Sequence, residues 1–364
     1  VMGDKHGKVV VLGTRDCSLQ RRNQKLVEEA PAPFLSDAQR ERIHTAARDI
    51  CAAAGYVSAG TVEFLLSQSG AISFLEVNTR LQVEHPVTEQ TTGVDLVVEQ
   101  LRVADGLPLS ITQTPAPLGH SFEFRINAED VGRGFLPTPG PVQRFDAPSG
   151  PGVRLDTGVQ TGSVVPGTFD SLMAKLIVTG ATREQALARA RRALREFQID
   201  GVASVLPFHR AVIDHPDFVG AEGFKVHTRW IESDFATPLA AAVRAAPVAD
   251  TSLLRTAIEI DGRRVQLGLP AVLLQGLAAA GGQGAAGAPA EAAVDAAAVT
   301  SPIAGNLHAW KVADGDTVQE GDVIAVMEAM KMEMQVTAHR AGRVALAAAA
   351  GTAQALGAVI ARIA

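Results

Sequence analysis

The sequence is poor in residues that mark several common protein classes. Only two cysteines occur in 364 residues, and the spacing of Cys17 and Cys51 fits neither a disulfide framework nor a metal-binding pair. Aromatic residues make up 4% of the chain, so alanine, valine and leucine must form most of the core. This cysteine usage is typical of a reducing compartment, and no signal peptide is recognisable, so we expect a cytoplasmic protein.

The chain also has no basic excess and no clear membrane-spanning run. Its formal net charge is -6 and its pI is about 5.9, which argues against a nucleic-acid partner. The apolar stretch 344–364 is rich in alanine and glycine and contains Arg362, which indicates short strands rather than a membrane helix. We therefore predict neither a nucleic-acid partner nor a membrane partner.

Periodicity and composition predict an α+β chain of several domains. Residues 36–54 form an amphipathic helical pattern with Ser36 and Gln39 at capping-box spacing, and a second capped helix is predicted from Thr182. Residues 61–66 and 71–77 read as a hairpin, and a shorter hairpin is predicted within 258–269. Residues 275–298 are mostly alanine and glycine, which predicts a linker. The predicted segments are 1–114, 115–231, a connector 232–274, a linker 275–299, and 300–364.

The last segment repeats internally. Residues 304–305 return as 341–342, and residues 323–325 return as 359–361, which is 36 positions later. Between the copies lies Glu-Ala-Met-Lys-Met-Glu-Met, with Lys331 at its centre. Two similar strand-and-turn halves would place this junction at a turn, so we predict Lys331 at the tip of an exposed hairpin. An isolated lysine would be an ordinary surface residue, and it is the repeat that favours a specific role.

Five polar residues stand at every second position from the end of the first predicted hairpin onwards: Glu76, Asn78, Arg80, Gln82 and Glu84. An extended chain would point all of them to one side, where burial without partners would be costly. Their oxygen atoms, with Glu63 on the preceding strand, suit Mg²⁺, and Arg80 can hold an anion. The pattern alone also fits an ordinary solvent-facing strand.

Two stretches resemble known families. The heptapeptide around Lys331, at the centre of the repeat, resembles the biotinyl attachment sequence of biotin carboxyl carrier domains over residues 301–364. Residues 76–86, Glu-Val-Asn-Thr-Arg-Leu-Gln-Val-Glu-His-Pro, resemble the biotin carboxylase branch of the ATP-grasp enzymes, a match that covers about residues 1–230 and includes 15–22, 24–25, 27–31 and 125–130. The resemblance implies a partial ATP-grasp domain, a biotin carboxylase C-terminal domain and a flattened all-β biotinyl barrel.

The resemblance also implies an activity and its residues. Members of the biotin carboxylase family are ATP-dependent ligases that activate bicarbonate and carboxylate biotin, with Mg²⁺ or Mn²⁺; here the biotin would be covalently attached to Lys331. Glu84 would be the general base, and Arg125 would stabilise the enolate-like ureido group of biotin. Glu129 and Asp130 are expected to brace Arg125, and His85 is expected to be structural. The remaining implied sites are metal ligands at Glu63, Glu76 and Asn78; bicarbonate contacts at Lys25, Arg80, Gln82 and the Val83 backbone; and nucleotide contacts at Gln20 and at Asn23, where many relatives carry histidine.

The order of segments resembles the α subunit of two-component acyl-CoA carboxylases of the acetyl- or propionyl-CoA type. That implies a carboxyltransferase β subunit, a biotin protein ligase and an oligomeric assembly as partners, besides ATP and bicarbonate. The family's glycine-rich phosphate lid is not found, so we expect the chain to lack the amino-terminal region of such a subunit. Two alternatives stay open: a biotinylated carrier without ATP-dependent activity, and a carboxylase with another acceptor, such as methylcrotonyl-CoA, geranyl-CoA or urea.

Overall fold

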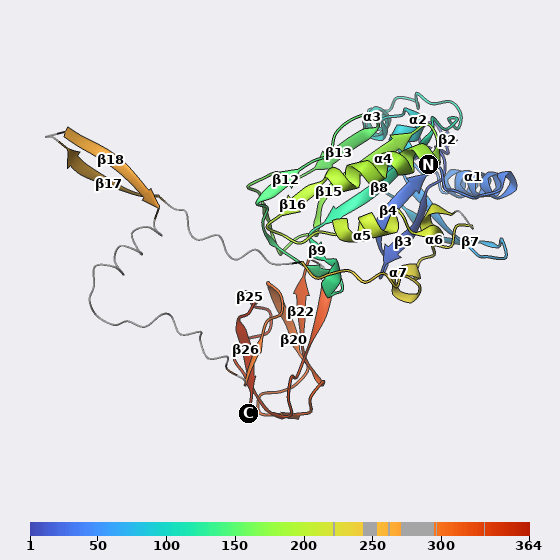
Figure 1. Ribbon diagram of the computed structural model, residues 1–364. Coiled ribbons are helices and arrows are strands. Elements are labelled where there is room, and N and C mark those ends of the chain that lie inside the picture. Colours follow the sequence, from blue (N-terminus) through green and yellow to red (C-terminus); the bar gives the residue numbers. More distant parts are fainter. Residues whose placement is uncertain (221–222, 243–252, 261–262, 271–294, 296, 331) are drawn as a thin grey trace, which may run out of the picture. The chain divides into compact units, whose positions relative to one another are not determined.

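The computed structural model describes residues 1–220, 223–242, 253–260, 263–270, 295, 297–330 and 332–364. The chain divides into two units, the first built on Val1–Ala242 and the second within residues 243–364 (Figure 1). None of the helices in these ranges is both long and apolar enough to cross a membrane.

A five-stranded antiparallel sheet forms the centre of the first unit. Along β8 the side chains alternate, with Phe122, Phe124 and Ile126 in the apolar core and Glu123 and Arg125 on the other face. Helix α4 (Arg183–Glu196) packs on the apolar face, and α2 (His85–Thr92) contacts β4, β8 and β15 (Figure 1). The sheet therefore presents a polar row beneath α2. Its strand order is β13 (Val153–Thr157), β15 (Leu172–Gly180), β8 (His120–Asn127), β4 (Gln24–Ala30) and β3 (Asp16–Arg21).

The two predicted capped helices are confirmed. In α1 (Asp37–Ala53), Ser36 accepts a hydrogen bond from the Gln39 backbone, and the Gln39 side chain returns one to the Ser36 backbone. At α4 the Thr182 hydroxyl accepts from the Gln185 backbone, whereas the Gln185 side chain reaches Ala181 instead. The buried stripe of α4 is Ala186, Leu187, Ala190, Ala193 and Leu194.

Short elements complete the first unit. The predicted hairpin is present as β6 (Thr61–Leu66) and β7 (Ile72–Asn78). A small sheet in the order β2 (Val9–Val10), β1 (Met2–Gly3), β5 (Ser58–Ala59) shares a core with α3 (Leu96–Ala104). The other strand pairs are β9 (Glu129–Asp130) with β10 (Leu136–Pro137), β11 (Gly140–Pro141) with β14 (Val164–Val165), and β12 (Arg144–Asp146) with β16 (Gln198–Asp200); the remaining helices are η1 (Val131–Arg133), α5 (Leu206–Val212), α6 (Pro216–Val219) and α7 (Trp230–Ser233).

The predicted extended run through Glu84 is wrong beyond Asn78. Strand β7 ends at Asn78, residues 79–84 form a loop and turn, and α2 begins at His85. The turn is closed by a hydrogen bond from the His85 backbone to Gln82 O. Pro86 lies in the first helical turn, where proline's missing N–H costs nothing. A proline two residues after Glu84 thus favours a helix start over a continuing strand.

The terminal barrel consists of two four-stranded sheets with the same internal order. Moving β20 (Gly305–Trp310), β21 (Thr317–Val318) and β22 (Val323–Ala329) forward by 36 or 37 residues gives β24 (Gly342–Leu346), β25 (Ala353–Gln354) and β26 (Val359–Ile363). The same shift places β19 (Ala298–Thr300) within the range of β23 (Met332–Thr337). Exchanging each strand for its counterpart in the other half converts the order β19-β26-β24-β21 into β23-β22-β20-β25. The predicted all-β barrel with two related halves is confirmed, and its first strand begins at Ala298.

The hairpin in the predicted connector is longer than the sequence suggested. Strands β17 (Leu253–Ile260) and β18 (Arg263–Pro270) pair along their whole length, compared with the predicted range 258–269. The predicted turn residues Asp261 and Gly262, and nearly all of the predicted linker 275–299, lie outside the described residues.

Candidate active site

Three predicted metal ligands come together on the β6–β7 hairpin. Glu63 pairs directly with Glu76 across the two strands. Asn78 Nδ2 donates to Glu63 Oε1 at 3.1 Å and to Glu76 Oε1 at 3.0 Å. Carboxylate and amide oxygens are the hard ligands that Mg²⁺ prefers, and Asn78 would join the two carboxylates as a ligand by turning its Oδ1, instead of its NH2 group, towards them. Among the described residues no group of three or more His, Cys, Asp or Glu is placed to hold a metal, so a site here depends on the amide.

Lys25 connects this acidic hairpin to the predicted base. From strand β4, its Nζ donates to Glu63 Oε1 at 2.8 Å and to Glu84 Oε1 at 2.9 Å. Gln82 Nε2 also donates to Glu63 Oε1, at 2.9 Å. Burial alone would lower the pKa of Lys25, but Cys17 and the carboxylates of Glu84 and Glu63 raise it above its usual range. Lys25 therefore stays a cation, shared between the two carboxylates.

Glu84 lies at the N-cap of α2 and is almost fully buried, with 1% exposure. Its Oε2 accepts from Arg125 Nη2 at 2.9 Å. Burial by itself would raise the pKa of Glu84, but Arg15, Lys25 and Arg125 together lower it to about 2. Glu84 is thus a carboxylate held by positive charge on two sides.

The sequence did not reveal several residues that build this site. Arg15 Nη2 donates to Gln82 Oε1 at 2.6 Å and to Thr61, and its Nη1 donates to Thr88, so it ties the loop, the hairpin and α2 together. Lys175 Nζ donates to Val83 O at 3.1 Å, which fixes the turn just before Glu84. The alternation of polar and apolar residues along β8 was a usable signal for this face of the sheet.

The predicted brace of Arg125 is wrong. Glu129 accepts hydrogen bonds from Ser171, Asn127 and Gln24, and Asp130 caps η1 at Gly132. Arg125 Nε instead donates to Glu28 Oε1 at 2.7 Å. Glu28 lies on the neighbouring strand β4, and cross-strand neighbours are closer to a side chain than residues further along its own strand.

Other predicted residues lie at the margin of the site. Arg80 is exposed, and its Nη2 is 3.4 Å from Asn78 Oδ1, so its guanidinium faces solvent beside the acidic hairpin.

The two predicted nucleotide contacts lie on and next to strand β3. Gln20 donates to Cys17 O. Asn23 forms the two-residue turn between β3 and β4 with Arg22, both with positive φ. Within the described ranges no hydrogen bond joins Gln20 or Asn23 to the acidic hairpin. The turn gives a physical reason for asparagine, which tolerates this conformation.

The central lysine of the heptapeptide, Lys331, lies outside the described residues. The strands that flank it in sequence are β22 and β23, which leave residues 330 and 331 between them. Met330 has a φ of 50°, a left-handed value that tight two-residue hairpin turns require.

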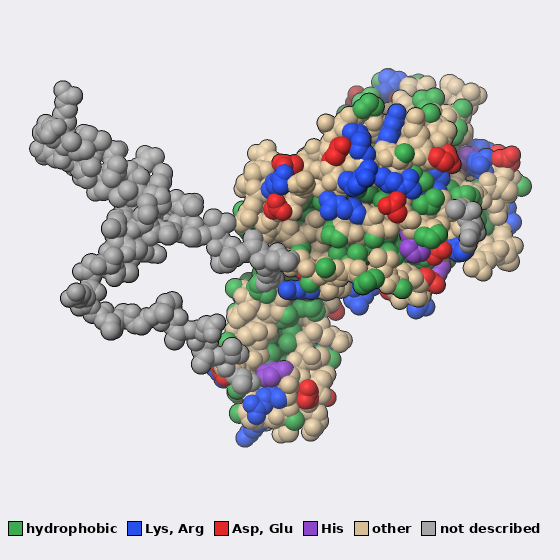
Figure 2. Space-filling view, viewed as in Figure 1, with side chains coloured by type: hydrophobic (Ala, Val, Ile, Leu, Met, Phe, Trp, Pro, Cys, Tyr) green, Lys and Arg blue, Asp and Glu red, His purple; other side chains and the backbone are tan. Residues whose placement is uncertain are grey.

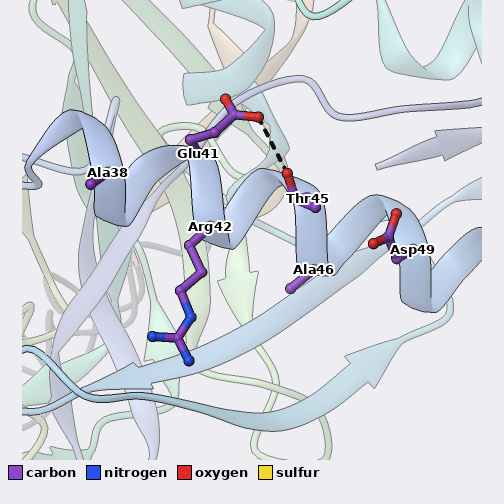
Figure 3. Close-up of a pocket in the computed structure, with 6 residues that line it drawn as sticks. All are labelled: Ala38, Glu41, Arg42, Thr45, Ala46 and Asp49. Atoms are coloured by element: carbon purple, nitrogen blue, oxygen red, sulfur yellow. Dashed lines mark hydrogen bonds between the residues drawn. The ribbon is translucent and has the colours of Figure 1, made fainter.

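Two conspicuous surface features are separate from these residues. The hollow in Figure 3 runs along one face of α1 and contains none of the predicted site residues; it is lined by Ala38, Glu41, Arg42, Thr45, Ala46 and Asp49. Figure 2 shows Lys and Arg side chains gathered over the region of α4. On α4 itself, Arg189, Arg191 and Arg192 donate to carbonyl groups of their own unit, which indicates a structural role.

Three family models together match most of the chain. Residues 1–112 match the ATP-binding domain of the carbamoyl-phosphate synthase L chain, and residues 123–233 match the biotin carboxylase C-terminal domain. Residues 297–363 match the domain of biotin-requiring enzymes. The biotin-dependent acyl-coenzyme A carboxylase alpha3 subunit of Mycobacterium leprae is 55% identical over 380 aligned positions, which include all of this chain and 63% of that subunit. The chain belongs to the biotin-dependent carboxylases.

The first unit matches other members of the biotin-dependent carboxylases in sequence and in structure. The biotin carboxylase of a Nostoc species is 50% identical over 60% of this chain and 49% of its own length. The biotin carboxylase domain of the Hydrogenobacter thermophilus 2-oxoglutarate carboxylase, solved with MgADP, ADP and bicarbonate, is 44% identical with a TM-score of 0.61, over 64% of this chain and 51% of that one. This chain thus spans about half to two thirds of the relatives it matches. The resemblance inferred from sequence is confirmed.

Proposed function

We propose that this chain is the biotin carboxylase and biotin carrier subunit of an acyl-CoA carboxylase of the acetyl- or propionyl-CoA type. The observation that carries the proposal is the Lys25–Glu84–Arg125 cluster beside the acidic hairpin, in one chain with a barrel whose central heptapeptide contains Lys331. The 55% identity to an acyl-CoA carboxylase alpha subunit supports the acyl-CoA type. ATP and bicarbonate are the substrates of the first half-reaction.

In this proposal Glu84 is the general base that takes the proton of bicarbonate. A carboxylate with a pKa of about 2 is ionised at neutral pH but is a weak base. When bicarbonate draws Lys25, and the biotin ring draws Arg125, away from Glu84, Glu84 loses part of its stabilisation and its basicity rises. Binding of the substrates by Lys25 and Arg125 would therefore also make Glu84 a stronger base.

The acidic hairpin would hold Mg²⁺ or Mn²⁺ through Glu63, Glu76 and Asn78. The metal, when bound, supplies positive charge to the phosphate groups of ATP. Arg125 would offer a fixed guanidinium to negative charge that develops on the biotin ring. Bicarbonate would be held by Lys25, Arg80, Gln82 and the backbone of Val83, and the nucleotide would be contacted by Gln20 and Asn23.

Covalent biotin on Lys331 would carry the carboxyl group to a separate carboxyltransferase β subunit, and a biotin protein ligase would attach it. We assign these roles to predicted domains 1–114, 115–231 and 300–364, joined by the connector and linker, in a cytoplasmic oligomer. The proposal also has two weaker forms: a carrier without ATP-dependent activity, and a carboxylase with a different acceptor.

Two assays on the purified chain test the proposal. Intact-mass and peptide analysis after incubation with a biotin ligase should find one biotinyl group, on Lys331, and none in Lys331→Arg. ATP cleavage that depends on both bicarbonate and free biotin should be present in the wild type and reduced about 10²–10⁴-fold in Glu84→Gln. Biotinylation without such ATP cleavage would leave only the carrier function, and absence of both would refute the proposal.

A further inference from the structure

A pair of buried carboxyl groups lies behind Arg125 and has no part in the mechanism above. Glu28 on β4 and Glu123 on β8 are directly paired residues in the sheet, and both have 0% exposure. Directly opposed side chains have Cβ atoms about 4.5–5.5 Å apart, so the two carboxyl groups share one small volume.

The two members of the pair have different partners. Glu28 Oε1 accepts a charge-assisted hydrogen bond from Arg125 Nε. Within the described part of the chain, neither oxygen of Glu123 has a hydrogen-bond partner, and Glu28 Oε2 has none either. A buried carboxylate without partners is strongly disfavoured, whereas a protonated carboxyl is neutral and can donate to a neighbouring oxygen.

Several charged groups face Glu123 from the surrounding elements. Glu28 on β4 and Glu84 at the start of α2 disfavour its ionised form, whereas Lys175 on β15 and Arg125 on β8 favour it. His85, in the first turn of α2, lies near Lys175, and its Nδ1 is 2.8 Å from Gln82 O. Burial and the neighbouring glutamates raise the pKa of Glu123 well above its usual value. Burial also raises the pKa of Glu28, but the guanidinium of Arg125 opposes that rise and favours the ionised form of Glu28.

We propose that Glu28 and Glu123 are positioning residues that together carry one negative charge. Glu28 is ionised and holds the guanidinium of Arg125, while Glu123 keeps a proton that it donates to the free oxygen of Glu28. The ionised Glu28 already balances the charge of Arg125, and a second ionised carboxylate here would leave a net negative charge beside the guanidinium that is offered to the ligand. The function of this arrangement rests on the role proposed for Arg125, but the protonation of the pair does not.

The protonation is tested by infrared spectroscopy on the full chain at neutral pH. A carbonyl band of a buried protonated carboxylic acid should be present in the wild type, absent in Glu123→Gln and retained in Glu41→Gln, an exposed glutamate on α1. No such band in the wild type, or a band that survives Glu123→Gln, would overturn the proposal.

Stability against pH gives a second readout. Because the folded chain binds the Glu123 proton more tightly than the unfolded chain does, the stabilisation that this proton provides is complete below about pH 4.5 and decreases as the pH rises. The melting temperature of Glu123→Gln, relative to the wild type, should therefore increase from pH 5 to pH 8. A difference that is the same at every pH would indicate that Glu123 is not protonated in the folded chain.

The positioning role is tested by kinetics with free biotin. Glu28→Gln should lower kcat about tenfold or more with a smaller change in the KM for ATP, because a neutral amide oxygen holds the guanidinium of Arg125 more weakly than the carboxylate does. The ratio of kcat in Glu123→Gln to that in the wild type should rise with pH. If the wild type has no bicarbonate-dependent turnover, the proposed function fails. The infrared and stability results still decide whether Glu123 is protonated in the folded chain. An unchanged kcat in Glu28→Gln would refute the positioning role.

Discussion

At the scale of single residues, the site is a set of buried charges that neutralise one another. Glu84 accepts hydrogen bonds from Lys25 and Arg125, and Lys25 also reaches Glu63. Breaking such a buried network by removing one member leaves the others without compensation, which is costly. The same network that prepares the chemistry therefore contributes to the stability of the first unit.

Glu84→Gln should reveal this contribution in the dependence of stability on pH. The folded pKa of Glu84 is lowered from 4.5 to about 2, so its stabilisation is complete above about pH 4.5 and is lost as the pH falls towards 2. A shift of this size corresponds to about 3 kcal/mol. The free energy of unfolding should be lower in Glu84→Gln than in the wild type by about this amount at pH 7, and the difference should shrink towards pH 2.

Urea unfolding can measure this difference in the free energy of unfolding for the first unit alone. The chain has two tryptophans, of which Trp230 is buried in the first unit and Trp310 lies in the barrel. A Trp310→Phe background makes Trp230 the only indole reporter. A difference between Glu84→Gln and the wild type that does not depend on pH would contradict the depressed pKa.

Glu76→Gln should weaken the use of magnesium. Glu76 is one of two carboxylates next to Asn78, and loss of an anionic oxygen lowers the affinity of the set for a hard cation. We expect the magnesium concentration for half-maximal ATP cleavage to rise about tenfold, with Glu41→Gln as the control. An unchanged magnesium requirement would exclude Glu76 as a ligand.

At the scale of elements, the sequence predicted the polar residues of the site but not the path of the chain through them. Residues 76–84 were expected to form one strand, yet they pass through the end of β7, a loop and the start of α2. Glu76, Asn78, Gln82 and Glu84 still converge, because the loop folds Gln82 back onto Glu63. The alternation of polar and apolar residues correctly predicted which side chains share a face of the strand. It carried no information about the residue at which the strand ends.

Long capped elements were predictable because their signals are local. The capping box of α1 and the hairpin β6–β7 depend on residues within a few positions of one another. The contacts of Arg15 with Thr61, Gln82 and Thr88 span 46 to 73 positions and have no local signature. Residues such as Arg15, Glu28 and Lys175 could be assigned only after the sheet had brought them together.

Gly93 should be important for the helix that carries Glu84. It ends α2 with a φ of 71°, a conformation that is costly for most L residues. Gly93→Ala should destabilise the first unit by about 1 kcal/mol, whereas Gly93→Asn should cost less because asparagine tolerates this region. The urea assay with Trp230 measures both. An equal loss of stability in the two variants would point to a steric rather than a conformational cause. The structure favours the conformational cause, because only Leu118 lies near the added Cβ, at 3.6 Å.

At the scale of the whole molecule, the chain combines a mixed α+β unit with an all-β barrel that repeats itself. The 36-residue repeat predicted the barrel and its two related sheets, because each half supplies the same four strands. The sequence also indicated that the barrel is a separate domain, through the alanine- and glycine-rich stretch that precedes it. Two units with their own cores should tolerate loss of function in one without loss of structure in the other.

This separation predicts independent effects of two substitutions. Lys331→Arg should abolish biotinylation but leave cleavage of ATP with free biotin unchanged, because the barrel supplies no residue of the Lys25–Glu84–Arg125 cluster. Glu84→Gln should abolish that cleavage but leave biotinylation at wild-type extent. Loss of both activities in either variant would indicate that the units do not function separately.

The most direct test of the account is transfer of labelled carbon from bicarbonate to the protein's own biotin. The biotinylated chain is incubated with labelled bicarbonate, magnesium and ATP, and protein-bound label is measured after rapid separation. We predict label that requires ATP and is absent in both Lys331→Arg and Glu84→Gln. A fully biotinylated wild-type chain that acquires no label under these conditions would contradict the account.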